Sequence, residues 1–235
     1  MRPSRSRSPC APFRRRPRRS ASADGGSRPL DAGRGAGGGG VMERVRCFFC
    51  LPLAPELKKE IAAWIAANRA AVSGVRWVAE GDLHVTLRFC GEIPQAAAQA
   101  LGERVKDLLS ERRAAPPTLT LRKTGTFGRP PRVLWAGLGG DTAALERLNA
   151  LIEGACRDEG LPPDGRKFSP HLTLARMDAS RGFDPAALDA LRPWKLTGRG
   201  WTADRAIFMR SRLTPAGPRY EPLTVCRLGT AADGA

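Results

Sequence analysis

The chain has 235 residues, of which 42% are hydrophobic, and a formal net charge of +16. This length allows one large domain or two small ones, and the apolar content is sufficient for a buried core. It contains no run of about 18 apolar residues, so we expect no membrane-spanning helix. It also lacks an apolar secretory signal, which favours a cytoplasmic protein. The basic balance favours a polyanionic partner such as nucleic acid.

The N-terminal segment differs sharply in composition from the rest. Residues 1–40 contain ten arginines and two aspartates and end in four glycines. Such a segment buries too little apolar surface to offset its ordering entropy, so we expect residues 1–41 to be a disordered basic extension. A transit peptide and an RNA-binding arm are two functional interpretations. We favour a third, a start codon placed upstream of the true domain start at Met42. We also expect a short disordered tail over 230–235.

From Met42 onward, the pattern of apolar residues is that of a globular domain. Helices are predicted to begin at Pro55, Pro94, Asp141 and Asp184. The predicted strands are 45–53, 76–78, 83–89, 118–123, 132–138, 171–176, 195–200, 206–213 and 223–228. The helices and strands do not alternate strictly, which indicates an α+β fold rather than a doubly wound α/β fold.

The six cysteines do not form a recognisable metal or disulfide pattern. Cys47 and Cys50 make a CxxC within a predicted strand, and no second CxxC or Cys/His pair lies nearby. We therefore expect ordinary core cysteines.

Both histidines of the chain lie in one repeated tetrapeptide, His84-Val85-Thr86-Leu87 and His171-Leu172-Thr173-Leu174. In a strand, alternate residues share a face. Each copy therefore buries its apolar residues and projects an imidazole and a hydroxyl together from the opposite face. If two lobes face each other, four polar side chains meet in one cleft.

This set suits phosphodiester hydrolysis without a metal. The reaction needs a base to activate water and an acid to protonate the departing oxygen, and histidine can be either near neutral pH. Threonine hydroxyls can bind the non-bridging oxygens of the phosphate. A solvated strand histidine explains either copy alone, but explains both copies poorly. A zinc site is a second alternative, for which the strands provide a poor ligand set.

The duplicated motif resembles that of the two-histidine (2H) phosphoesterases, and in particular the RNA 2′,3′-cyclic phosphodiesterases, also called 2′-5′ RNA ligases. The resemblance covers about residues 42–228. It includes four further segments, which are 76–78 (RWV), 89–92 (FCGE), 127–128 with 131–135 (FG and PRVLW) and 211–220 (SRLTPAGPRY).

The resemblance implies a bilobal, pseudo-two-fold α+β fold with two antiparallel sheets facing a central cleft and helices outside. The lobes would be about 42–133 and 134–229. It also implies hydrolysis of RNA 2′,3′-cyclic phosphate ends to 2′-phosphomonoesters, with His84 as proton donor and His171 as proton acceptor. Thr86 and Thr173 match the phosphate-binding threonines. The reverse reaction, 2′-5′ ligation, is expected as a minor activity.

Several further expectations follow. We expect a monomer that needs no metal or other cofactor and binds RNA ends. By alternation, Arg88 shares the cleft face with the first motif and Arg176 lies on the other face; Arg132 and Phe48 are further candidates for RNA contact. The alternatives are a relative that acts on another small cyclic phosphate, such as ADP-ribose cyclic phosphate or a cyclic nucleotide, and a non-catalytic RNA-end binder.

Overall fold

The computed structural model describes residues 43–178, 182–191, 193–215 and 217–229. The predicted disordered segments at the two ends and Cys10 lie outside these residues. The strands are β1 (Arg44–Pro52), β2 (Val75–Trp77), β3 (His84–Pro94), β4 (Thr118–Phe127), β5 (Val133–Gly140), β6 (His171–Met177), β7 (Gly200–Thr202), β8 (Arg205–Thr214) and β9 (Gly217–Arg227). The helices are α1 (Pro55–Asn68), α2 (Gln95–Glu111) and α3 (Thr142–Asp158), with short 3₁₀ turns η1 (Glu80–Asp82) and η3 (Pro185–Ala190).

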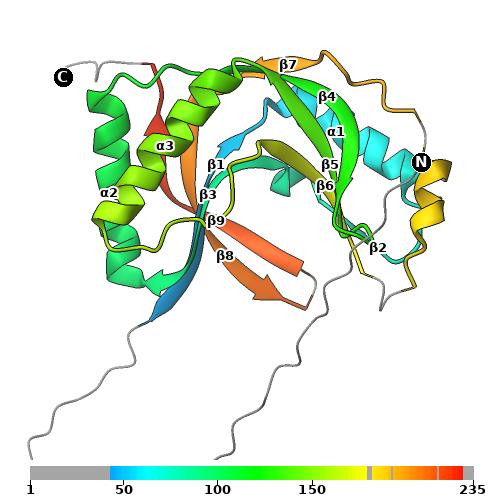
Figure 1. Cartoon of the computed structure of the whole chain (residues 1–235), viewed down its shortest axis with the longest axis horizontal. Coiled ribbons are helices and arrows are strands. Elements are labelled where there is room, and N and C mark those ends of the chain that lie inside the picture. Colours follow the sequence, from blue (N-terminus) through cyan, green and yellow to red (C-terminus); the bar gives the residue numbers. More distant parts are fainter. Residues whose placement is uncertain (1–42, 179–181, 192, 216, 230–235) are drawn as a thin grey trace, which may run out of the picture. The chain divides into compact units, whose positions relative to one another are not determined.

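The strands form an antiparallel sheet, as expected for the α+β class (Figure 1). Their order is β7-β4-β5-β6-β3-β1-β8-β9, and β2 pairs with β6. The two motif strands, β3 and β6, are therefore neighbours at the middle, and each begins one half of the sheet.

Two details of the predicted architecture need correction. The two expected sheets are one continuous sheet, because Val85 of β3 pairs with Leu172 of β6. A division of the chain near residue 133 does not describe the halves either. Strands β8 and β9 return from the end of the chain to pair beside β1, while β4 from the first half of the chain pairs with β5.

One predicted strand is also wrong. Residues 195–199 are not a strand, since Gly198 has a φ of 89° and the chain turns there. Arg199 N–H donates to the Leu196 carbonyl across this turn, at 3.1 Å. The short strand β7 begins after this turn and pairs with β4 from Gly200 to Thr202.

The helices bury their apolar faces against the sheet. Helix α2 packs on β9 and contacts α3, which packs on β3 (Figure 1). As predicted, Asp141 caps α3, with its Oδ1 accepting a hydrogen bond from Ala144 N–H at 3.0 Å. Cys47 and Cys50 are buried and unbridged, as expected for core cysteines. None of the helices in the described ranges is long and apolar enough to cross a bilayer.

Candidate active site

A β-bulge interrupts β3 directly after the first motif. Along the ladder with β1, the register advances from Thr86 to Arg88 while β1 advances by one residue, so Leu87 is the extra residue. A bulge shifts the alternation of side chains by one position. Phe89, not Arg88, therefore joins His84 and Thr86 on the cleft face, and all three line one cavity.

The second motif has a bulge at the same place. Along the ladder with β5, the register advances from Thr173 to Ala175, which leaves Leu174 as the extra residue. Arg176 therefore joins His171 and Thr173 on the cleft face, and the three line a common cavity. The prediction that placed Arg176 on the other face is wrong, because strict alternation does not hold across the bulge.

Arg88 is correspondingly turned into the protein interior. It is 5% exposed and forms an ion pair with Glu153 of α3. Its guanidinium also donates to the carbonyls of Phe89 and Pro162. The expectation that Arg88 reaches substrate is therefore wrong. Its contacts join β3 to α3 and to the loop that leads to the second motif.

The pairing of β3 with β6 brings the two motifs together. Val85 and Leu172, the paired residues, are both fully buried. In an antiparallel pair, the residues that flank such a position lie opposite each other and point to the other face of the sheet. His84 therefore lies beside Thr173, and Thr86 lies beside His171. An approximate two-fold axis between β3 and β6 relates the two motifs.

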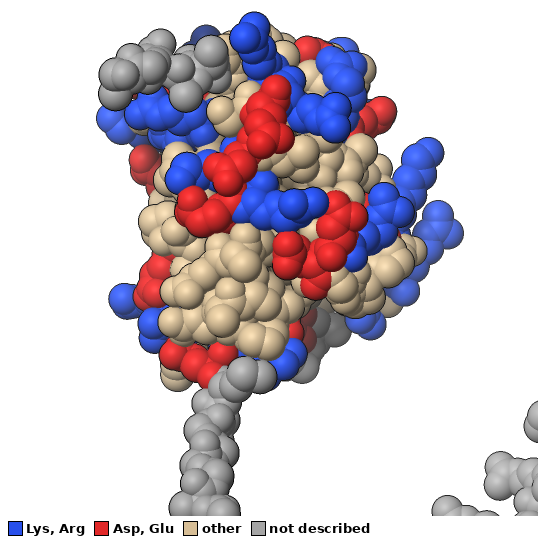
Figure 2. Space-filling view, turned by 90° about the vertical axis from the view of Figure 1, so that its left-hand side faces the viewer, with Lys and Arg blue, Asp and Glu red and all other residues tan. Residues whose placement is uncertain are grey.

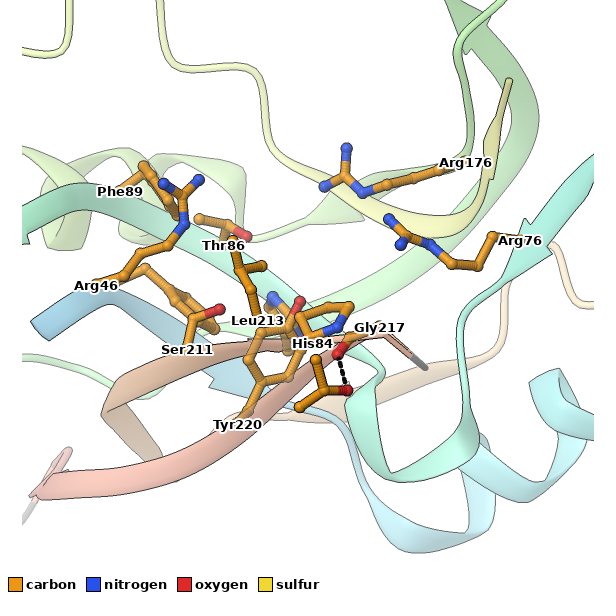
Figure 3. A pocket seen from close by; sticks show the side chains of 13 residues that line it. Arg46, Arg76, His84, Thr86, Phe89, Arg176, Ser211, Leu213, Gly217 and Tyr220 are labelled. Carbon is orange, nitrogen blue, oxygen red and sulfur yellow. Dashed lines mark hydrogen bonds between the residues drawn. The ribbon is translucent and has the colours of Figure 1, made fainter. Parts of the chain in front are cut away.

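These side chains line two adjoining cavities. The first, of about 350 Å³, contains His84 (Figure 3). The second, of about 590 Å³, contains His171 and Thr173. Thr86, Phe89 and Arg176 line both cavities, so the two form one cleft along the central strands. The structure thus gathers all four predicted polar residues of the motifs.

The two imidazoles are held in the same way by the main chain. His84 Nδ1 lies 2.6 Å from the Asp82 carbonyl, and His171 Nδ1 lies 2.8 Å from the Ser169 carbonyl. A carbonyl oxygen only accepts, so each Nδ1 carries the proton and donates. In both residues, Nε2 is left as the nitrogen that can gain or lose a proton.

Aromatic rings surround His84. Its ring centroid lies 4.9 Å from that of Phe48 and 5.2 Å from that of Tyr220, which stands perpendicular to it. Phe48 and Tyr220 also make an edge contact with each other, at 5.1 Å between centroids. His171 has an aromatic neighbour of its own, because Phe127 stands edge-on at 4.9 Å. The first imidazole therefore lies in the more apolar surroundings.

This environment changes the acidity of the His84 imidazolium. Burial is the main cause that lowers the pKa of His84 from 6.5 to about 4. The hydrogen bond to the Asp82 carbonyl acts in the opposite direction, while Coulombic interactions with Lys58, Arg176 and His171 lower the pKa further. The neutral imidazole is therefore the favoured form of His84 near pH 7.

The other sequence candidates divide between cleft and surface. Phe48 lines the first cavity, as expected, whereas Arg132 is exposed and lines neither cavity. Sequence reasoning did not assign a role to Tyr220 or Arg76, which both line the first cavity. Both lie in segments that carried the family resemblance, so the signal was present. Among the described residues, no group of three or more His, Cys, Asp or Glu side chains is placed to hold a metal ion.

Strands β3 and β6, each with a His-x-Thr motif, lie side by side at the centre of one cleft. This fold and this site together are those expected of a two-histidine phosphoesterase. Residues 57–214 match the family described as the 2′-5′ RNA ligase superfamily. The chain belongs to this family, and the expected resemblance is confirmed.

Curated relatives and solved structures agree with this assignment. The chain is 31% identical over 195 residues to an RNA 2′,3′-cyclic phosphodiesterase of Geobacillus stearothermophilus, covering 82% of this chain and 60% of that relative's length. It is 32% identical over 186 residues to the Escherichia coli RNA 2′,3′-cyclic phosphodiesterase, covering 78% and 96% of the two chains. The structure of E. coli LigT complexed with 3′-AMP superposes with a TM-score of 0.63 at 27% identity, over 80% of this chain and all (100%) of that one. The expectation that the chain is an enzyme of this class is thereby confirmed at the level of the family.

Proposed function

We propose that this protein hydrolyses RNA 2′,3′-cyclic phosphate ends to 2′-phosphomonoesters by acid–base catalysis. The observation that carries the proposal is the pair of imidazoles in one cleft, each with Nδ1 bound to a main-chain carbonyl and Nε2 left for proton transfer. His84 is the acid that protonates the departing 3′ oxygen, and His171 is the base that takes a proton from water. The first step of binding places the cyclic phosphate between them.

The threonines complete the site. Thr86 and Thr173 lie on the cleft face of the same two strands, so their hydroxyls can donate to the non-bridging phosphate oxygens. Such donors stabilise the negative charge that increases on these oxygens in the transition state. Because each threonine runs beside the histidine of the other motif, each half of the sheet contributes to both ends of the phosphate.

The low pKa of His84 sets a condition on this mechanism. The imidazole must carry two protons to act as a donor at Nε2, and burial disfavours this charged form. A phosphate anion beside the ring favours the imidazolium instead. His84 therefore acquires its proton when substrate binds, and the proton is present only while a phosphate is there to receive it.

The same residues serve ligation. A 5′ hydroxyl takes the place of water and attacks the cyclic phosphate while His171 accepts its proton. The bond from phosphorus to the 3′ oxygen breaks and His84 protonates that oxygen, which leaves a 2′-5′ phosphodiester and a free 3′ hydroxyl. We propose this ligation as a minor activity. RNA is the proposed partner, and the monomeric state and cytoplasmic location stay predictions.

The test compares turnover with binding. The protein is assayed on an RNA 2′,3′-cyclic phosphate, an ADP-ribose cyclic phosphate and a 3′,5′-cyclic nucleotide, in excess EDTA, and the position of the product phosphate is determined. We expect turnover of the RNA end to a 2′-phosphate. His84→Ala and His171→Ala should each lower kcat about 10²–10⁴-fold while RNA binding is retained.

Each contrary outcome has a defined meaning. If the protein prefers another cyclic phosphate, that compound class is its substrate and the RNA end is not. If EDTA abolishes the activity and one divalent metal restores it, the metal-free mechanism is refuted. If the wild-type protein binds RNA ends without turnover of any substrate, it is an RNA-end binder.

A further inference from the structure

Two arginines face each other across a pair of strands at one end of the cleft. Arg76 of β2 is the direct partner of Arg176 of β6 in the antiparallel ladder. Like charges at directly opposite positions destabilise a sheet. Among the ion pairs formed by the described residues, none involves either arginine. Within the described residues, no ion pair offsets the repulsion between these two arginines.

Both arginines are exposed to solvent, and both line the first cavity. Both side chains extend toward His84 and Thr86 from one side, while Arg46 and Phe89 lie on the other side (Figure 3). Burial raises the pKa of the Tyr220 hydroxyl; Arg176 and Arg76 lower it, and the Asp82 carboxylate raises it. The two cations thus share one neighbourhood, bounded by the ring that covers His84.

The balance of charge in this part of the cleft is one-sided. The residues that line the first cavity include three arginines and neither an aspartate nor a glutamate. One of the three, Arg46, already lies over the Phe89 ring, at 4.4 Å from its centroid. The second cavity differs, because Glu153 and Asp164 line it together with its cations.

The face formed by α2 and α3 does not show the same excess. On the side of α2 and α3, basic and acidic side chains are intermingled (Figure 2). Ion pairs such as Arg104 with Asp158, at 3.0 Å, join these two helices. Unbalanced positive charge in the first cavity is therefore a feature of the site and not only of the basic composition.

The proposed function already assigns other residues to the reacting phosphate. It lies between the two histidines and the two threonines, and Arg176 borders it because this residue lines both cavities. Arg76 lines the first cavity and not the second, so it lies to the side of the reacting phosphate. A guanidinium there meets an anion other than the reacting one, and its planar donors match a phosphate.

We infer that the arginine pair is a subsite for a second phosphate, the phosphodiester that links the terminal nucleotide to the rest of the RNA. The inference rests on the proposed function and specifies its substrate. The enzyme prefers a cyclic phosphate at the end of a chain to a free nucleoside 2′,3′-cyclic phosphate, because only the former presents two phosphates to the cleft. Arg76 is a specificity-determining residue in this scheme, and Arg176 lies between the two phosphates.

The experiment measures kcat/KM for two substrates that differ only in that phosphate. One is a dinucleotide with a terminal 2′,3′-cyclic phosphate, and the other is the corresponding nucleoside 2′,3′-cyclic phosphate. Wild type should favour the dinucleotide. In Arg76→Gln, the ratio of the two kcat/KM values should fall about 10- to 100-fold, the usual worth of a hydrogen-bonded charge pair. Arg76→Lys keeps the charge without the planar fork and should fall between the two.

A matched control separates this contact from general charge. Arg219→Gln removes one positive charge from an exposed position on β9 that does not line the cavity, and it should leave the ratio unchanged. Salt gives an independent readout. For the dinucleotide, the slope of log(kcat/KM) against log[salt] should become shallower by about 0.7 in Arg76→Gln, the value for one phosphate contact to a single strand.

The outcomes distinguish the inference from the proposed function. If wild type turns over neither substrate, the proposed function fails. If it turns over both with equal kcat/KM, or if Arg76→Gln loses the same factor on both, the function stands and the second-phosphate subsite is refuted. A loss of ratio in Arg219→Gln equal to that in Arg76→Gln also refutes it.

Discussion

The burial of His84 has a measurable effect on stability as the pH falls. The unfolded chain binds a proton at this imidazole near pH 6.5, whereas the folded protein binds it near pH 4. Between these values, the unfolded state holds more protons, so acid favours unfolding. The stability in question is complete above pH 6.5 and is lost progressively as the pH falls toward 4.

The size of the effect follows from the two pKa values. At pH 5 the unfolded imidazole is almost fully protonated and the folded one is mostly neutral. The difference lowers the free energy of unfolding by about 2 kcal/mol relative to pH 7.5, and by about 3 kcal/mol at pH 4. Other groups add their own pH dependence, so the effect is read as a difference between wild type and a variant without the imidazole.

Urea unfolding at pH 7.5 and at pH 5 measures this change in the free energy of unfolding. His84→Gln should lose about 2 kcal/mol less than wild type between these values. His171→Gln is the matched control, since it retains His84 and should retain the loss of wild type. If wild type and His84→Gln lose the same free energy, His84 is not desolvated as the structure places it, and the substrate-coupled protonation proposed above has no basis.

Four further outcomes are expected. First, the acid limb of kcat/KM should lie near pH 4, because the doubly protonated histidine pair lacks a base; a limb above pH 6 contradicts the assigned site. Second, Arg88→Ala should lower the free energy of unfolding by about 3 kcal/mol, as it leaves a half-buried carboxylate and two carbonyls without this partner, whereas Arg104→Ala on the surface should change it by less than about 1 kcal/mol; equal losses in urea unfolding would show that the contacts of Arg88 do not stabilise the fold more than a surface ion pair does. Third, Thr86→Val should lower kcat/KM about tenfold, the effect of one hydrogen bond, and Thr126→Val, which is exposed outside the cleft, should not; similar rates for both would exclude the phosphate contact. Fourth, deletion of residues 1–41 should leave turnover of a dinucleotide intact, and loss of turnover would assign the extension a part in the site.

The motifs and their chemistry could be predicted from the sequence because the strand period is simple. Alternation alone placed His84 with Thr86 and His171 with Thr173, and the structure brings these four into one cleft. The alternation of residues in the sequence could not show which half of the sheet each strand joins. Pairing of β8 with β1, which also places β9 in this half of the sheet, depends on contacts between residues more than 150 positions apart, such as Phe49 with Phe208.

Positions after the bulges were not predictable by the same rule. In the second motif, two successive apolar residues, Leu174 and Ala175, already break the alternation and mark where it shifts. The first motif offers no such mark, because the residue turned inward is charged. Arg88 is buried only because Glu153 and two carbonyls, all distant in sequence or fixed by the bulge, receive its donors. Periodicity carries no information about such partners.

The bulges also make the two-fold frame of the cleft asymmetric at one position. Both copies of the motif keep the histidine and the threonine in register, since the chemistry needs one of each on either side of the phosphate. The fifth residue after each histidine is released from the core and turned to the cleft, so it is free to differ. It is Phe89 in one copy, with a flat apolar ring, and Arg176 in the other, with a cation. A nucleotide is asymmetric, with a base at one end and phosphates at the other. Under the proposed function, one extra residue in each repeat therefore places an aromatic ring at one end of the cleft and a cation at the other, and this difference sets the orientation of the bound nucleotide.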